Sequence, residues 1–153
     1  MRYDRQMILP EIGEEGQRKL KQAKVLIVGV GGLGSPIALY LAGAGVGCIG
    51  LVDDDVVSIS NLQRQVLYSE KELGKPKAIC AAERLSALNS ETTSQPYPTR
   101  LTEENAQEII SQYDIVVDGC DNFPTRYLIN DICAKTGKVY VCLLYTSPSP
   151  RDS

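Results

Sequence analysis

The chain has 153 residues, of which 43% are hydrophobic and 23% charged, and its formal net charge is −3 at pH 7. This length is enough for one domain with a core, and the acidic balance argues against binding to nucleic acid or to an anionic membrane surface. The chain has no histidine, which excludes Ser-His-Asp triads, Cys-His pairs and histidine metal ligands within it.

The cysteine pattern and the N-terminus point to an intracellular setting. The five cysteines are odd in number and none has C-x-x-C spacing, so neither a disulfide framework nor a zinc site is expected within this chain. No apolar run approaches the ~20 residues of a membrane helix. The polar first residues lack the apolar core of a signal peptide. We therefore expect a cytoplasmic protein that does not contact a membrane.

Predicted strands alternate with predicted helices along the chain. An amphipathic N-terminal segment ends in a short helix over 16–23. Strands are expected over 25–30, 48–53, 92–99, 115–119 and 138–143. The third of these carries two prolines and should be short or irregular. Helices are expected over 35–44, 76–88, 103–113 and 124–136. The alternation predicts an α/β fold, a Rossmann-like, mostly parallel sheet with flanking helices.

The end of the chain departs from this pattern. In residues 142–153 serine and proline replace hydrophobic periodicity, so no further sheet element is expected there. The string resembles translated read-through of a sequencing adapter, an artefact rather than native sequence. We therefore expect one domain over residues 1–141, with a sheet that is incomplete at its C-terminal end, followed by a non-native tail.

The glycine-rich stretch from Val25 to Gly34 predicts a strand, a tight turn and a helix N-terminus, an arrangement that binds nucleotide phosphates. Gly29, Gly31 and Gly34 fit the G-x-G-x-x-G spacing, and Asp53 follows at the distance of an acid that accepts from ribose hydroxyls. These residues alone fit an NAD(P)- or FAD-dependent oxidoreductase equally well. A Walker-type phosphate loop fits poorly, because serine follows Gly34 where lysine is required.

Further residues favour a triphosphate. Arg64 lies in the loop after the second strand and Lys77 in the first turn of the next helix, and a hydride-transfer site has little use for two such cations. Asp121, beyond the end of a buried strand, could hold Mg²⁺. Strand ends at one edge of a parallel sheet converge on a crevice. Asp53, Arg64, Lys77 and Asp121 could therefore surround one ATP.

Six motifs in this order resemble the adenylation domain of the MoeB/ThiF/HesA (E1-like) family, whose members activate ubiquitin-like and sulfur-carrier proteins. They are Arg2–Gln6, Val28–Gly34, Asp53, Ser60–Gln65, Gly74–Lys77 and Asp118–Asn122. The resemblance covers the chain from residue 1 to about residue 141. The branches that adenylate the carrier of molybdopterin synthase or ThiS, in molybdenum-cofactor or thiamine biosynthesis, are the most similar, and the sequence does not choose between them.

The resemblance implies an enzyme that uses ATP and Mg²⁺. The C-terminal glycine carboxylate of a MoaD- or ThiS-type carrier attacks the α-phosphate, pyrophosphate leaves and an acyl-adenylate remains. Asp53 would hold the ribose, with Gly32, an extra glycine of the turn, beside the nucleotide. Asp121 would bind Mg²⁺. Arg5 would reach the ATP of a neighbouring subunit in a homodimer. The implied catalytic residues are Arg5, Arg64, Lys77 and Asp121, and the implied nucleotide-binding residues are Gly29, Gly31, Gly32, Gly34, Asp53, Ser60, Asn61, Leu62, Gln63, Arg64, Lys77, Asp121 and Asn122.

Two further interpretations stay open beside this one: the oxidoreductase, and a nucleotide-binding scaffold of the kind formed by inactive E1-like partners. Family members continue with further strands, a crossover loop that can carry a reactive cysteine, and often C-x-x-C pairs that bind structural Zn²⁺. A longer protein could hold zinc, but this chain has no ligands for it. We expect this fragment to be weakly active at best. Cys120 is not expected to be a nucleophile, because no base neighbours it.

Overall fold

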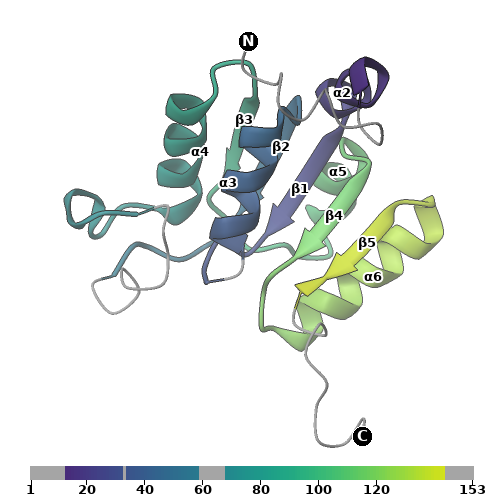
Figure 1. Ribbon diagram of the computed structural model, residues 1–153. Helices are drawn as coiled ribbons and strands as arrows, with labels where there is room; N and C mark the ends of the chain where they lie inside the picture. The colour runs from purple at the N-terminus through teal and green to yellow at the C-terminus, as the bar shows by residue number, and fades with distance from the viewer. Residues whose placement is uncertain (1–12, 33, 59–67, 144–153) are drawn as a thin grey trace, which may run out of the picture.

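The computed structural model describes residues 13–32, 34–58 and 68–143. Its centre is a five-stranded parallel sheet with the strand order β3-β2-β1-β4-β5 (Figure 1). The strands are β1 Lys24–Val28, β2 Cys48–Val52, β3 Thr93–Tyr97, β4 Ile115–Asp118 and β5 Val139–Cys142. The predicted α/β class and parallel sheet are confirmed.

One helix precedes β1, and helices connect the successive strands, as the alternation in the sequence predicts. They are α2 Gly13–Gln22, α3 Gly34–Ala44, the 3₁₀ turn η2 Glu70–Glu72, α4 Lys77–Leu88, α5 Ala106–Ser111 and α6 Phe123–Thr136. The helices predicted over 35–44, 76–88 and 124–136 are confirmed to within one residue at each end. Pro76 directly precedes α4, where its fixed φ favours the first helical turn.

Two predicted elements differ from the structure. The helix expected over 103–113 is the six-residue α5 alone, because the Asn105 side chain bonds to the loop before it. Its Oδ1 accepts from the Thr102 amide at 2.8 Å, and its Nδ2 donates to the Arg100 carbonyl at 3.1 Å. The third strand, expected over 92–99 and expected to be short or irregular, is shorter than that range but regular, since β3 has five residues. It tolerates its proline because it lies at the edge of the sheet.

The last strand extends into the residues that we expected to form the tail. Cys142 pairs with Asp118 in the β4–β5 ladder, and Leu143 packs against a hydrophobic cluster of the core. Residues 144–153 lie outside the described residues, so the expectation that the tail adds no further sheet element stays a prediction. The strand prediction over 138–143 is confirmed as far as Cys142.

The core has two halves, one on each face of the sheet. Val25 and Ile27 point to the face covered by α3 and α4, while Leu26 and Val28 point to the face covered by α5 and α6 (Figure 1). Burying each such side chain contributes about 1.5–3 kcal/mol. This two-sided burial explains why the strand reads as a continuous apolar run rather than an alternating one.

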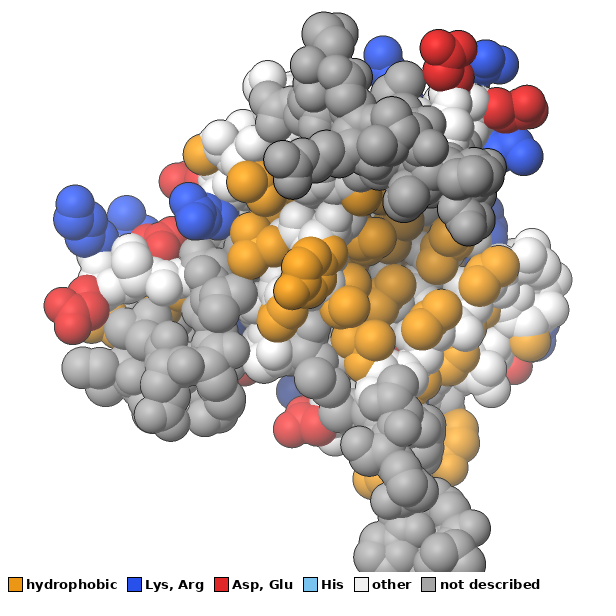
Figure 2. Space-filling model, viewed as in Figure 1, with side chains coloured by type: hydrophobic (Ala, Val, Ile, Leu, Met, Phe, Trp, Pro, Cys, Tyr) orange, Lys and Arg blue, Asp and Glu red, His pale blue; other side chains and the backbone are white. Residues whose placement is uncertain are grey.

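One part of the sheet lacks this two-sided cover. By register, Val139 and Val141 of β5 share the α3 face with Ile115 and Val117, yet they are 56% and 42% exposed. Tyr40 on α3 is exposed as well. Figure 2 shows hydrophobic side chains gathered on this face, and among the described helices none lies over β4 and β5 there.

No helix in the described ranges has both the length and the apolarity to cross a bilayer.

Candidate functional site

The strand order creates a crevice at the carboxyl ends of β1 and β4. The chain passes from β1 through α3 to β2 on one side, whereas β4 lies on the other side of β1. Ligands of open α/β sheets bind at this kind of topological switch point. A pocket of about 510 Å³ opens here, lined by the residues that follow β1, β2, β3 and β4 and by Lys77 at the start of α4.

The glycine turn after β1 packs tightly against its surroundings. Gly29 has φ +88°, which ends the strand, and a Cβ there would lie 2.9 Å from the Cys120 amide nitrogen. A Cβ at Gly34 would collide with the Gly29 carbonyl oxygen. Gly31 and Gly32 line the pocket. Only glycine therefore allows the turn, the first residue of α3 and the loop after β4 to approach this closely.

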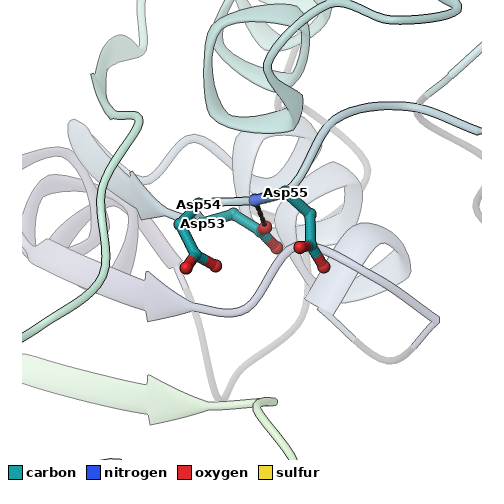
Figure 3. A group of neighbouring side chains, drawn as sticks. All are labelled: Asp53, Asp54 and Asp55. Carbon is teal, nitrogen blue, oxygen red and sulfur yellow. Dashed lines mark hydrogen bonds between the residues drawn. The ribbon is translucent and has the colours of Figure 1, made fainter.

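Asp53 joins the end of β2 to this turn. Its Oδ2 accepts a hydrogen bond from the Val30 amide at 2.9 Å, and its Oδ1 accepts one from the Asp55 amide at 2.8 Å. The carboxyl group is half-buried, and this burial raises its pKa, partly offset by the two amide donors and by Lys77. Figure 3 shows the three carboxylates that follow β2, whose candidate ligand oxygens lie within 4.8 Å of one another.

Lys77 is the first residue of α4 and lines the pocket while being only 5% exposed. Its amide donates to the Asp55 carbonyl at 3.0 Å. Tyr68, which the sequence motifs did not single out, holds this helix start against the glycine turn. Its hydroxyl lies 2.8 Å from the Val30 carbonyl oxygen and 3.4 Å from that of Lys77. Lys77 therefore brings a positive charge to the pocket from a helix start that hydrogen bonds hold in place.

The loop between β4 and α6 forms the opposite wall. Asp121 is exposed and lines the pocket. Asn122 also lines it and caps α6, because its side chain accepts from the Thr125 amide at 2.9 Å. Burial and the neighbouring Asp118 raise the pKa of Cys120 to about 12. The thiol is therefore protonated at neutral pH, which agrees with the expectation that Cys120 is not a nucleophile.

Sequence reasoning missed a second cation at the pocket. Arg100 follows β3 and lines the pocket, with its Nε 3.5 Å from Asp54 Oδ2, and both side chains are exposed. The only signal for it was a basic residue directly after the predicted strand over 92–99. Asp54 and Asp55 also line the pocket.

The pocket brings together most of the expected site residues that the structure describes. Gly34 lies behind the turn, buried at the start of α3, and does not line the pocket. The pocket residues expected from the sequence are Gly29, Gly31, Gly32, Asp53, Lys77, Asp121 and Asn122. Six others lie outside the described residues and stay predictions: Arg5, Ser60, Asn61, Leu62, Gln63 and Arg64.

Comparison with known proteins decides the family. Residues 3–143 match the family model described as "ThiF family". The chain belongs to the ThiF family. This confirms the resemblance inferred from the six motifs, and the fold agrees with it. The ThiF-family chain is 56% identical over 140 residues to the sulfur carrier protein adenylyltransferase of Thermus thermophilus, and 53% identical over 141 residues to the adenylyltransferase and sulfurtransferase MOCS3 of Danio rerio.

Solved structures of ThiF-like fold match as well. The tRNA N6-threonylcarbamoyladenosine dehydratase TcdA of E. coli, crystallised with ATP, has a TM-score of 0.86 and 29% identity over 92% of this chain and 58% of that one. MccB of E. coli has a TM-score of 0.76 and 34% identity over 82% of this chain and 37% of that one. The alignments to the Thermus and Danio relatives cover 92% of this chain, but only 52% and 31% of those proteins.

Proposed function

We propose that this chain is the nucleotide-binding part of an adenylyltransferase that activates the C-terminal glycine carboxylate of a ubiquitin-like sulfur carrier of the MoaD or ThiS type. The observation that carries the proposal is the pocket at the switch point, which joins the glycine turn, buried Lys77 and Asp121 in a chain 56% identical to a sulfur carrier protein adenylyltransferase. The names of the relatives and the ATP-bound TcdA structure support it.

The pocket suits ATP in shape and charge. The glycine turn and the N-terminus of α3 form a cradle that a Cβ at Gly29 or Gly34 would fill, and backbone N–H groups in such a cradle favour phosphate. Lys77 supplies a buried positive charge for phosphate oxygens. Each oxygen of Asp53 retains a second lone pair beyond the amide bond that it accepts, so the carboxylate can still take a ribose hydroxyl.

Mg²⁺ fits the acidic groups of the same pocket. Asp121 offers an exposed carboxylate on the wall opposite Lys77, and hard oxygen donors are the ligands that Mg²⁺ prefers. We propose Asp121 as its ligand, together with phosphate oxygens of ATP. When bound, the metal ion neutralises charge on the phosphates.

The proposed reaction is one displacement at phosphorus. A carboxylate oxygen of the carrier forms a bond to the α-phosphorus, the bond from that phosphorus to the bridging oxygen of the β-phosphate breaks, and pyrophosphate departs with the bond electrons. The protein contributes positioning and charge neutralisation, which dominate catalysis of such transfers. We propose that Lys77 acts here together with Arg64 and Asn61, which lie outside the described residues. We propose that the chain works as a homodimer in which Arg5 serves the neighbouring site.

Thermal unfolding with ATP–Mg²⁺ and with NAD⁺ tests the nucleotide. At a ligand concentration of 100 times Kd, binding to the folded state adds about 2.7 kcal/mol to the free energy of unfolding, so we expect ATP–Mg²⁺ to raise Tm. We expect no rise with NAD⁺. A rise with NAD⁺ and none with ATP would reject adenylation in favour of the oxidoreductase.

A pair of matched variants ties that result to the pocket. Lys77→Gln removes the buried charge in the pocket and should abolish most of the rise in Tm with ATP–Mg²⁺. Lys75→Gln makes the same change two residues earlier, at an exposed side chain outside the pocket, and should keep the rise. Equal responses of the two variants would place the nucleotide elsewhere.

A further inference from the structure

A buried carboxylate lies directly behind the pocket wall that carries Asp121. Asp118, the last residue of β4, is 0% exposed and does not line the pocket. Its Oδ1 accepts from the Cys120 amide at 3.0 Å, and its Oδ2 accepts from the Tyr140 hydroxyl at 2.7 Å. A buried charge requires such donors, because losing one leaves an unsatisfied acceptor that costs about 1–3 kcal/mol or more.

The Asp118 carboxylate holds the loop at the point where it meets the glycine turn. The Cys120 amide nitrogen that it binds is also the atom closest to the position of a Cβ at Gly29. One residue earlier, the Gly119 amide donates to the Val28 carbonyl at 2.8 Å. The next residues after Cys120 are Asp121 and Asn122, both in the pocket wall. A shift of the Cys120 peptide would therefore move the Asp121 carboxylate.

Tyr140 connects this loop to the edge of the sheet. It lies on β5, where it pairs with Val116, so its side chain shares a face with Asp118 and reaches it diagonally. Burial and the Asp118 carboxylate raise the pKa of Tyr140, which keeps its hydroxyl a donor throughout the physiological range. The next peptide unit, between Cys120 and Asp121, is held too, because Arg126 donates to the Cys120 carbonyl at 3.4 Å.

We propose that Asp118 and Tyr140 are a positioning pair that fixes the loop Gly119–Asn122 so that the Asp121 carboxylate stands ready for the metal ion of the bound nucleotide. This inference rests on the proposed function, since it names how that site is held. Neither residue contacts the nucleotide. Each acts through the Cys120 peptide, and β5 thereby becomes a support of the site rather than a mere edge strand.

Tyr140→Phe in the 153-residue chain tests the pair, with Tyr40→Phe as the matched control. Tyr40 undergoes the same loss of a hydroxyl at an exposed position on α3. Two quantities are measured: the hydrogen-exchange rate of the Cys120 amide without nucleotide, and the affinity for ATP by calorimetry with and without Mg²⁺. We expect Tyr140→Phe to speed Cys120 exchange by about tenfold or more, because the acceptor of that amide loses its second anchor.

The Mg²⁺ dependence separates positioning from general destabilisation. We expect the gain in ATP affinity that Mg²⁺ gives the unsubstituted chain to fall about tenfold in Tyr140→Phe, while the Mg²⁺-free affinity changes by less than about twofold. Tyr40→Phe should match the unsubstituted chain in both quantities. Two results for Tyr140→Phe would overturn the proposal. One is an equal loss of ATP affinity with and without Mg²⁺. The other is faster exchange of the Cys120 amide while Mg²⁺ raises the ATP affinity as much as in the unsubstituted chain.

Failure of the proposed function looks different. If the unsubstituted chain binds no ATP, the function itself fails, whatever the exchange data show. If the unsubstituted chain binds ATP but Mg²⁺ does not raise its affinity, the positioning proposal is overturned while the proposed nucleotide site stands. Should Tyr140→Phe not fold, Asp118→Asn replaces it, since an amide can still accept from Cys120 and donate to Tyr140. That variant should keep Cys120 exchange within about threefold of the unsubstituted rate, and a larger acceleration would contradict the proposed contacts.

Discussion

Cys120 and Asp53 line the same pocket, and burial raises the pKa of both groups, which favours their neutral forms. Their types and spacing were visible in the sequence, but their chemical states depend on burial and on the groups packed around them in the fold. For Cys120 burial has the largest effect, and Asp118, the last residue of β4, raises the pKa further. For Asp53 the neighbours include the Val30 amide, which lies in the glycine turn after β1.

Alkylation of Cys120 tests its chemical state. With a pKa of about 12, only about one thiol in 10⁴ is ionised at pH 8, so iodoacetamide should react with it about a thousandfold more slowly than with an ordinary peptide cysteine. The rate should rise about tenfold per pH unit from pH 7 to 10 without a plateau. The same cysteine in urea, read by mass spectrometry, is the control, and its rate should reach half of its maximum near pH 8.5 and level off about one pH unit higher. A plateau below pH 9 in the folded protein would contradict this assignment.

The raised pKa of Asp53 should appear in the pH dependence of ATP binding. In the proposed site the Asp53 carboxylate accepts from ribose hydroxyls, and its protonated form would accept more weakly, so the affinity for ATP should fall as pH decreases through the pKa of Asp53. Because burial raises that pKa, the fall begins at a higher pH than for an ordinary aspartate with a pKa of about 3.9.

Asp53→Asn supplies the reference for that measurement. At pH 7 it should bind ATP about tenfold more weakly, the loss expected for one charge-assisted hydrogen bond. At each pH the affinity of the unsubstituted chain is divided by that of Asp53→Asn, and this ratio cancels the effect of protonating ATP itself. That ratio should shrink toward one as the pH is lowered from 7 to 4, and a ratio constant over this range would rule out the role given to Asp53.

At the scale of elements, close backbone packing around the glycine turn determines how β1, α3 and the β4–α6 loop fit together. Gly34 begins α3 with no room for a side chain, since a Cβ there would meet the Gly29 carbonyl oxygen. Gly43 lies in the same helix, is exposed, and has nothing within 4 Å of the position of its Cβ. One helix therefore contains a glycine that packing requires and a glycine that it does not.

Alanine at these two positions should have opposite effects. Gly34→Ala should lower the free energy of unfolding by about 3 kcal/mol or prevent folding, because the added methyl group meets rigid backbone. Gly43→Ala should raise it by about 0.5–1 kcal/mol, since alanine loses less conformational entropy in a helix. Urea unfolding of both variants measures the difference. Similar midpoints for the two would contradict the tight packing of the turn.

At the scale of the whole molecule, the described elements cover one face of β4 and β5 but leave Val139 and Val141 exposed on the other. The alignment also covers only about half of the Thermus relative. The proposed carrier-binding part and the proposed pairing of two copies therefore concern surfaces beyond the pocket described here. The proposed pairing of two copies can be tested by mixing two inactive variants and measuring whether activity returns.

Mixing Arg5→Ala and Asp121→Ala chains should restore activity if Arg5 serves the neighbouring site. Each variant alone should lose even the weak activity expected of this fragment, measured as pyrophosphate exchange with ATP and the carrier protein. In an equal mixture, random pairing makes half the dimers mixed and gives each mixed dimer one intact site, so about a quarter of the unsubstituted activity should return. If Arg5 acts within its own chain, or if the copies do not pair, the mixture stays as inactive as its parts.

The sequence by itself determined the strands, three of the helices and the family, because these depend on local periodicity, on glycine and proline positions, and on ordered motifs. Only the tertiary structure decided which residues meet. Arg100, Tyr68 and Tyr140 carry no local signature, and they reach the site or its support through the strand order. The helix predicted over 103–113 was too long at its start, because the Asn105 side chain bonds to the loop before α5 and the helix begins only at Ala106. Burial and hydrogen bonding across strands are non-local, and they decide the charge and position of the groups in the pocket.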